Sequence, residues 1–157
     1  MSREYRPVSS EYQLGVFVDS VMHYFENAVQ QPAACGIPHL AVRASPQLAD
    51  YTGVVRICGQ RDGMVVFTAP RSMLCVMLMC MQDTDLSHEH LCELVGKIAD
   101  TLSGDAERIF RFQYSISVRS TVNERDAPLV YPPHARPIVI PIAWRSYQAR
   151  LVVCLDS

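Results

Sequence analysis

The segment Leu86 to Phe110, LSHEHLCELVGKIADTLSGDAERIF, has the clearest periodicity in the chain. Apolar residues recur in it at intervals of three and four positions, at Leu91, Leu94, Val95, Ile98, Ala99 and Leu102. This spacing places their side chains on one face of an α-helix. Because such a face is stable only when it is buried, the rest of the chain must provide a core against which this helix packs.

The opposite face of this helix carries three charged residues, Glu93, Lys97 and Asp100. At about 100° of rotation per residue they lie nearly above one another, and we call them the polar stripe. Two interpretations fit them. They could be a solvated ladder of ion pairs, worth about 0.2–0.5 kcal/mol per pair, or they could be a surface that the helix presents to a partner.

Local signals predict where this helix begins but leave its end open. Ser87 is suited to cap the first free amides, and Glu89 suits the positive end of the helix dipole. Leu86 and Leu91 are spaced to form a hydrophobic staple. Gly104 either stops the helix or allows close packing within a longer one.

The other segments complete an α+β pattern. Helical periodicity predicts a helix at 13–31, and apolar content all round predicts a buried helix at 73–81. Alternation and turn residues predict strands at 39–44, 51–58, 64–68, 112–118, 138–144 and 149–155. The strands at 51–58 and 64–68 should form a hairpin, and Pro141 implies a sheet edge or a bulge. The order of these segments predicts a two-layer domain.

Composition limits the possible functions. A chain of 157 residues with 49% apolar and 19% charged residues is the size of one folded domain, 1–157, and residues 1–10 look like a flexible arm. A net charge of −2 without a basic run argues against nucleic acid binding. The chain lacks a signal-peptide pattern and a long apolar run, which predicts a cytoplasmic protein without membrane association.

The sequence contains little metal or catalytic signal. The six cysteines form no CxxC pair, which is typical of reduced thiols. His88, His90 and Cys92 alternate as metal ligands on a strand could, but on a helix their side chains diverge, so we predict no metal site. Nucleotide-binding glycine motifs and the GxSxG motif of hydrolases are absent.

Three stretches together carry a family pattern. They are GKIADTLSG at 96–104, ISVRST at 116–121, and IVIPIAW followed by ARLVVCL near the C-terminus. With the opening helix, this pattern resembles the CheC/CheX/FliY family of bacterial chemotaxis phosphatases, specifically the short CheX-like members. The resemblance implies an α+β, two-layer domain in which a mixed sheet of about six strands packs against long helices.

The resemblance also implies a site. In that family the Glu and Asn of an ExxN motif, followed by a glycine, reach into the active site of a phosphorylated response regulator such as CheY. The Asn orients the attacking water and the Glu contacts the partner, commonly through a lysine. The partner supplies Mg²⁺, so no cofactor of this chain is implied. By position, Glu corresponds to Lys97, Asn to Asp100 and the glycine to Gly104.

Both defining residues of the motif are therefore changed, and Arg119 replaces the proline of the family's ISxPT strand. Asp100 lacks amide donors and brings a negative charge toward an anionic phosphoryl group, while Lys97 would repel a partner lysine. The pattern implies a receiver-binding protein, through Glu93, Lys97, Asp100 and Gly104, with weak or no phosphatase activity. Two alternatives remain: an active phosphatase with Asp100 as base, and a non-enzymatic module that forms a homodimer.

Overall fold

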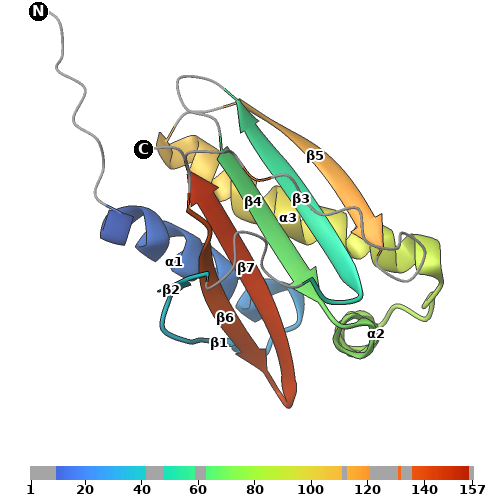
Figure 1. Cartoon of the computed structure of the whole chain (residues 1–157). Helices are drawn as coiled ribbons and strands as arrows, with labels where there is room; N and C mark the ends of the chain where they lie inside the picture. The colour runs from blue at the N-terminus through green and yellow to red at the C-terminus, as the bar shows by residue number, and fades with distance from the viewer. Residues whose placement is uncertain are drawn as a thin grey trace, which may run out of the picture.

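The computed structural model describes residues 10–41, 48–58, 63–110, 113–120, 131 and 136–155. Three helices and seven strands follow one another along the chain (Figure 1). Their bounds are α1 Ser10–Ala28, β1 Ala34–Cys35, β2 His39–Leu40, β3 Tyr51–Cys58, β4 Gly63–Ala69, α2 Arg71–Cys80, α3 His88–Phe110, β5 Gln113–Ser120, β6 Ile138–Trp144 and β7 Tyr147–Leu155.

All strands belong to one sheet with the order β1-β6-β7-β4-β3-β5, and β2 also pairs with β6. The sheet is thus about six strands wide, as predicted, but every recorded pairing is antiparallel rather than mixed. The connection through α2 and α3 does make β5 run in the same direction as β4. Because β3 lies between these two strands, they form no parallel pair.

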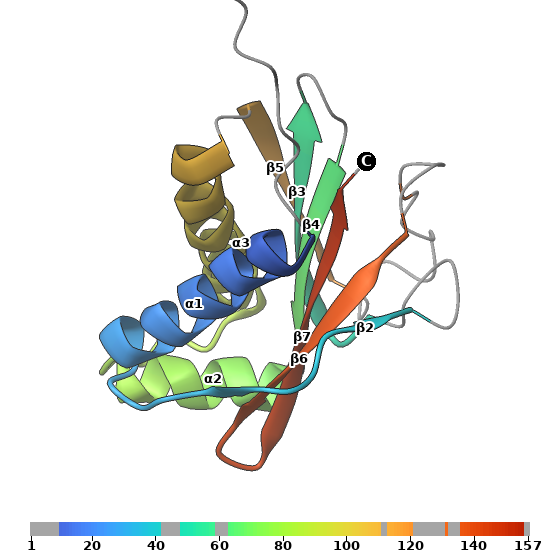
Figure 2. The same cartoon turned by 90° about the vertical axis from the view of Figure 1, so that its left-hand side faces the viewer.

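The helices cover one face of the sheet and make the two-layer α+β domain that the sequence predicts (Figure 2). The six periodic apolar residues of α3 are all buried, together with the apolar faces of α1 and α2. The most deeply buried described residues of α1 are Phe17, Val21 and Phe25, which are at most 1% exposed. Burial of this continuous surface is the main favourable contribution to folding.

The two layers approach each other closely at Gly53 of β3. A Cβ atom there would lie 2.5 Å from the backbone oxygen of Val95 and 2.9 Å from the Cβ of Ala99. On the helix side, a Cβ atom on Gly96 would lie 2.7 Å from Cγ2 of Val118 in β5. Glycines on both elements therefore let α3 lie directly on β3 and β5.

The other face of the sheet carries a second buried cluster, which includes the paired residues Met64 and Cys154. Its members come from β3, β4, β6 and β7, and Tyr131 packs against them. Burial raises the pKa of the Tyr131 hydroxyl to about 12. Because both faces are covered, β4 is buried along its whole length, and its residues are mostly apolar rather than alternating.

Pro141 lies where the outer neighbour of β6 is interrupted. β1 pairs with residues 142–143 and β2 with residues 138–139 of β6. The proline has no amide hydrogen to donate, and its carbonyl accepts a hydrogen bond from the backbone nitrogen of Gly36 at 2.8 Å. β6 is therefore not the outermost strand. Its outer neighbours pair with residues on either side of Pro141, so no hydrogen bond in this pairing needs an amide hydrogen at position 141.

Most predicted elements lie within a few residues of their observed bounds. The predicted hairpin is confirmed by the register of β3 and β4. The strand predicted at 39–44 is recorded only as β2, and residues 42–47 lie outside the described part of the chain. Of the predicted arm, residues 1–9 also lie outside it, and Ser10 already belongs to α1. In the part of the chain that is described, no helix is long and apolar enough to cross a membrane.

Candidate partner-binding site

The polar stripe lies on the outer surface of α3, as its periodicity predicts. Glu93 and Lys97 are exposed and Asp100 is half-buried, while the residues between them point into the core. Gly104, one turn after Asp100, is half-buried and lies inside the unbroken helix. The helix therefore continues past Gly104 rather than ending there, and it presents the four residues on one rigid element.

The backbone of α3 is well held on both sides of the stripe. Thr101 donates a hydrogen bond from Oγ1 to the carbonyl oxygen of Lys97 at 2.8 Å. Ser87 accepts one at Oγ from the backbone nitrogen of His90 at 3.3 Å, which confirms the predicted N-cap. The stripe is thus displayed by a helix whose first turn is capped and whose interior is continuous.

A charged cluster lies beside the N-terminal end of the stripe. His90 Nε2 lies 2.5 Å from Oδ2 of Asp83, and His90 Nδ1 lies 3.4 Å from Oε2 of Glu93. The hydrogen bond with Asp83 raises the pKa of His90. The backbone amide of Asp85, and then His90, lower the pKa of Asp83. Glu93 therefore contacts a histidine whose own charged form is favoured by Asp83. The sequence did not predict this contact.

The predicted divergence of His88, His90 and Cys92 holds only for His90, because His88 and Cys92 are one helical turn apart and lie side by side. His88 Nδ1 lies 2.9 Å from the hydroxyl of Tyr51, whereas His90 faces Asp83. Cys92 is on the His88 side, with Sγ 3.7 Å from His88 Nε2. Among the described residues, no group of three or more His, Cys, Asp or Glu side chains is arranged to hold a metal ion.

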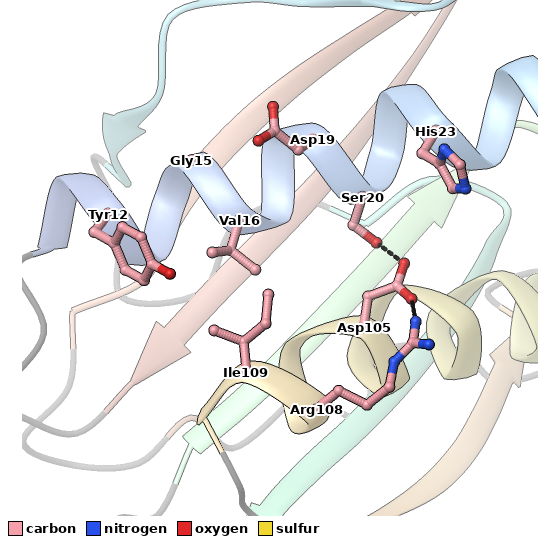
Figure 3. Close-up of a pocket in the computed structure, with 9 residues that line it drawn as sticks. All are labelled: Tyr12, Gly15, Val16, Asp19, Ser20, His23, Asp105, Arg108 and Ile109. Atoms are coloured by element: carbon pink, nitrogen blue, oxygen red, sulfur yellow. Dashed lines mark hydrogen bonds and ion pairs between the residues drawn. The ribbon is translucent and has the colours of Figure 1, made fainter.

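The structure also contains a groove between α1 and α3 that sequence reasoning missed (Figure 3). It has a volume of about 640 Å³ and is lined by Tyr12, Gly15, Val16, Asp19, Ser20, His23, Asp105, Arg108 and Ile109. Ser20 donates a hydrogen bond to Oδ2 of Asp105 at 2.6 Å, and Arg108 pairs with the same carboxylate. The i, i+3 spacing of Asp105 and Arg108 is a signal in the sequence for their ion pair. The contact with Ser20 has no such signal, because Ser20 is distant along the chain.

Arg119, the third changed position, lies in β5 opposite Thr52 of β3. β5 is the outermost strand at its end of the sheet, next to the layer that carries α3. The structure therefore brings the polar stripe and the altered ISxPT strand onto neighbouring elements. The groove between α1 and α3 is lined on the α3 side by Asp105, Arg108 and Ile109, which follow the polar stripe along the helix.

Comparison of the sequence with family models and with curated proteins gives no match. Comparison of the structure with solved structures gives close similarity in fold. The chemotaxis protein CheX of Vibrio vulnificus has a TM-score of 0.77 at 17% identity, over 92% of this chain and 99% of that chain. A chemotaxis protein of Desulfovibrio vulgaris Hildenborough has a TM-score of 0.79 at 16% identity, over 96% and 100%.

A third similar structure is a complex of CheX with CheY, BeF₃ and Mg²⁺ from Borrelia burgdorferi. It has a TM-score of 0.72 at 9% identity, over 92% of this chain and 98% of that chain. All three matches span nearly the whole of both chains, so the similarity covers the complete arrangement of helices and sheet. This protein therefore has the fold of the CheC/CheX family, as the pattern of its sequence predicts.

Proposed function

We propose that this protein is a CheX-type signalling protein that binds a response-regulator receiver domain through the outer face of α3. The observation that carries the proposal is the position of the polar stripe. Glu93, Lys97 and Asp100 lie on the accessible face of a helix whose opposite face is fully packed, in a fold also found in a CheX that forms a complex with CheY. Asp100 and Lys97 occupy the positions where the resemblance puts the catalytic Asn and Glu.

The chemistry of the stripe supports weak or no phosphatase activity. An Asn side chain can donate and accept hydrogen bonds to a water at once, whereas an ionised Asp only accepts. The Asp100 carboxylate would also meet the negative charge of an aspartyl phosphate, which raises the energy of the complex as attack begins. Lys97 attracts the phosphoryl group but has no lone pair to position a nucleophile. The stripe is thus better suited to contact a phosphorylated receiver than to hydrolyse it.

In this proposal the receiver domain, and not this chain, binds Mg²⁺. The receiver domain would bring the metal ion with its phosphoryl group, and this chain would contribute only side chains from α3. Glu93 and the neighbouring Asp83 and Asp85 would meet basic groups on the receiver, with a contribution that depends on salt concentration.

The test follows phosphate loss from a phosphorylated cognate receiver domain mixed with this protein. We expect the wild type to bind the receiver without speeding its dephosphorylation. The double variant Lys97→Glu with Asp100→Asn restores the ExxN pattern and is expected to accelerate it. Lys97→Glu alone is the matched control, because it restores the charge at 97 without the amide at 100.

Two outcomes would overturn parts of the proposal. If the wild type accelerates phosphate loss and Asp100→Ala abolishes this, Asp100 is a base and the protein is an active phosphatase. If receiver domains in either phosphorylation state fail to bind, the partner is wrong.

The alternative of a homodimerising module is favoured by one observation. Among the described strands β5 pairs only with β3, so its outer edge has backbone groups available for a second copy. Light scattering over a concentration series would show a dimer. Replacing Val118, which is 36% exposed on β5, with proline would then give a monomer that keeps receiver binding if the two functions are separate.

A further inference from the structure

His88, Cys92 and Tyr51 form an arrangement at the start of α3 that the proposed function does not use. His88 and Cys92 are one helical turn apart, and Cys92 Sγ lies 3.7 Å from His88 Nε2. The other ring nitrogen, His88 Nδ1, lies 2.9 Å from the hydroxyl of Tyr51. A thiol, a base and a group that orients the base therefore lie next to one another in space. This is the general arrangement of an activated nucleophile.

The surroundings of the three residues favour this role. Tyr51 is 2% exposed, so its ring is fixed by the core while its hydroxyl reaches His88. The ring centroids of Tyr51 and His88 are 5.5 Å apart, which restricts the imidazole further. His88 is exposed and Cys92 is half-buried, so small solutes can reach the sulfur.

The charges around the pair also favour a thiolate. Burial raises the pKa of the Tyr51 hydroxyl, and the Arg71 guanidinium at the start of α2 opposes this rise, so a cation lies near the cluster. When Nδ1–H of His88 donates to Tyr51, the Nε2 lone pair is left to accept the Cys92 proton. The resulting thiolate and imidazolium attract each other near the N-terminus of a helix.

We propose that Cys92 is a reactive thiol that hydroperoxides oxidise to a sulfenic acid, with His88 as its base and Tyr51 as a positioning residue. The thiolate sulfur attacks one oxygen of hydrogen peroxide, and the O–O bond breaks. One oxygen stays on sulfur as S–OH, and the other leaves as hydroxide, which takes the proton held by His88 and becomes water. Sulfur is oxidised and the peroxide is reduced, so no further reactant is needed.

The test compares two cysteines within the same folded protein. The reduced full chain is treated with hydrogen peroxide, sulfenic acid is trapped with dimedone, and each labelled cysteine is identified by peptide mass spectrometry. Cys58, which is exposed at the opposite end of β3 from Tyr51, is the internal reference. We expect Cys92 to be labelled about tenfold faster than Cys58 near neutral pH.

Two variants separate chemistry from structure. His88→Gln keeps a polar side chain without a base and should lower the Cys92 rate to that of Cys58. Tyr51→Phe keeps the buried ring and should move the pH midpoint of Cys92 alkylation by iodoacetamide upward, because the imidazolium loses an acceptor. Equal labelling of Cys92 and Cys58 in the wild type, or an unchanged Cys92 rate in His88→Gln, would overturn the proposal.

Discussion

The backbone oxygen of Val95 in α3 lies so close above Gly53 in β3 that a Cβ atom on residue 53 would be 2.5 Å from it. The Cβ of Ala99 closes the same space from one turn further along, at 2.9 Å. Both neighbours belong to a helix that is packed on its whole inner face, so they cannot move aside singly. The height of α3 above the sheet is therefore set by the absence of a side chain at position 53.

This contact predicts opposite effects for two glycine substitutions. Gly53→Ala should lower the free energy of unfolding by about 1–3 kcal/mol, because the helix must shift to admit the methyl group. Gly15→Ala is the matched control, since Gly15 lies in α1 with nothing within 4 Å of the added Cβ. It should raise the free energy of unfolding by about 0.5–1 kcal/mol through helix propensity. Urea unfolding measures both, and a neutral Gly53→Ala would contradict this packing.

The cluster around His90 predicts a pH dependence of stability. Its hydrogen bond with Asp83 raises the pKa of His90 above the ordinary value of 6.5. The stability that this pair contributes is therefore fully present below pH 6.5 and is lost as the pH rises through the raised pKa of the folded protein. The pKa of Asp83 is lowered, so its contribution is lost only in acid, as the pH falls below its ordinary value of 3.8.

Urea unfolding at about pH 5.5 and about pH 8 checks this sign, since the first lies below and the second above the ordinary titration of histidine. We expect the wild type to be less stable at the higher pH, and His90→Gln to remove most of that difference. His23→Gln, on the exposed face of α1, should leave the difference in place. If His90→Gln behaves like His23→Gln, the cluster does not stabilise the start of α3.

The N-cap of α3 predicts a measurable loss on truncation. Ser87→Ala removes the acceptor for the backbone nitrogen of His90 and should lower the free energy of unfolding by about 1 kcal/mol. Ser87→Asp keeps an acceptor and should be close to the wild type. Ser72→Ala, at an exposed position in α2, serves as the control and should change stability by less than about 0.5 kcal/mol. Equal effects of Ser87→Ala and Ser72→Ala would argue against the cap.

The contact between α1 and α3 predicts coupling between Ser20 and Asp105. Ser20 is 5% exposed and its hydroxyl donates to the Asp105 carboxylate at 2.6 Å. In a double-mutant cycle, Ser20→Ala and Asp105→Ala should show an interaction energy of about 1–2 kcal/mol, because either substitution alone already removes the hydrogen bond to the charged group. A cycle of Ser20→Ala with Asp19→Ala, an exposed neighbour in the same groove, should be additive.

Local sequence signals were sufficient for the helices and for the surface of α3. The apolar period of residues 86–110 determined which side is buried, because the burial of a helix face depends on residues close together in the chain. The polar stripe was predicted for the same reason. The role of Gly104 could not be decided locally, since glycine suits both a helix end and a packed helix interior.

Features that depend on pairing between distant segments could not be predicted. β1 and β2 have two residues each, which is too short for an alternating pattern to be recognised. The sheet is antiparallel, and not mixed, because β3 lies between β4 and β5. The residues within these strands do not indicate which strands will be neighbours. The bonds of Tyr51 with His88 and of Ser20 with Asp105 were missed because each joins residues that only the tertiary fold brings together.

The position of Gly53 also bears on how such a fold can change its chemistry over time. The requirements on the interior of α3 are strict, since residue 53 must lack a side chain and the inner helix face must stay apolar. At the outer positions, Glu93 and Lys97 are exposed and Asp100 is half-buried. Substitutions can therefore accumulate on the outer face one residue at a time while the scaffold persists, so one architecture can present different side chains to its surroundings.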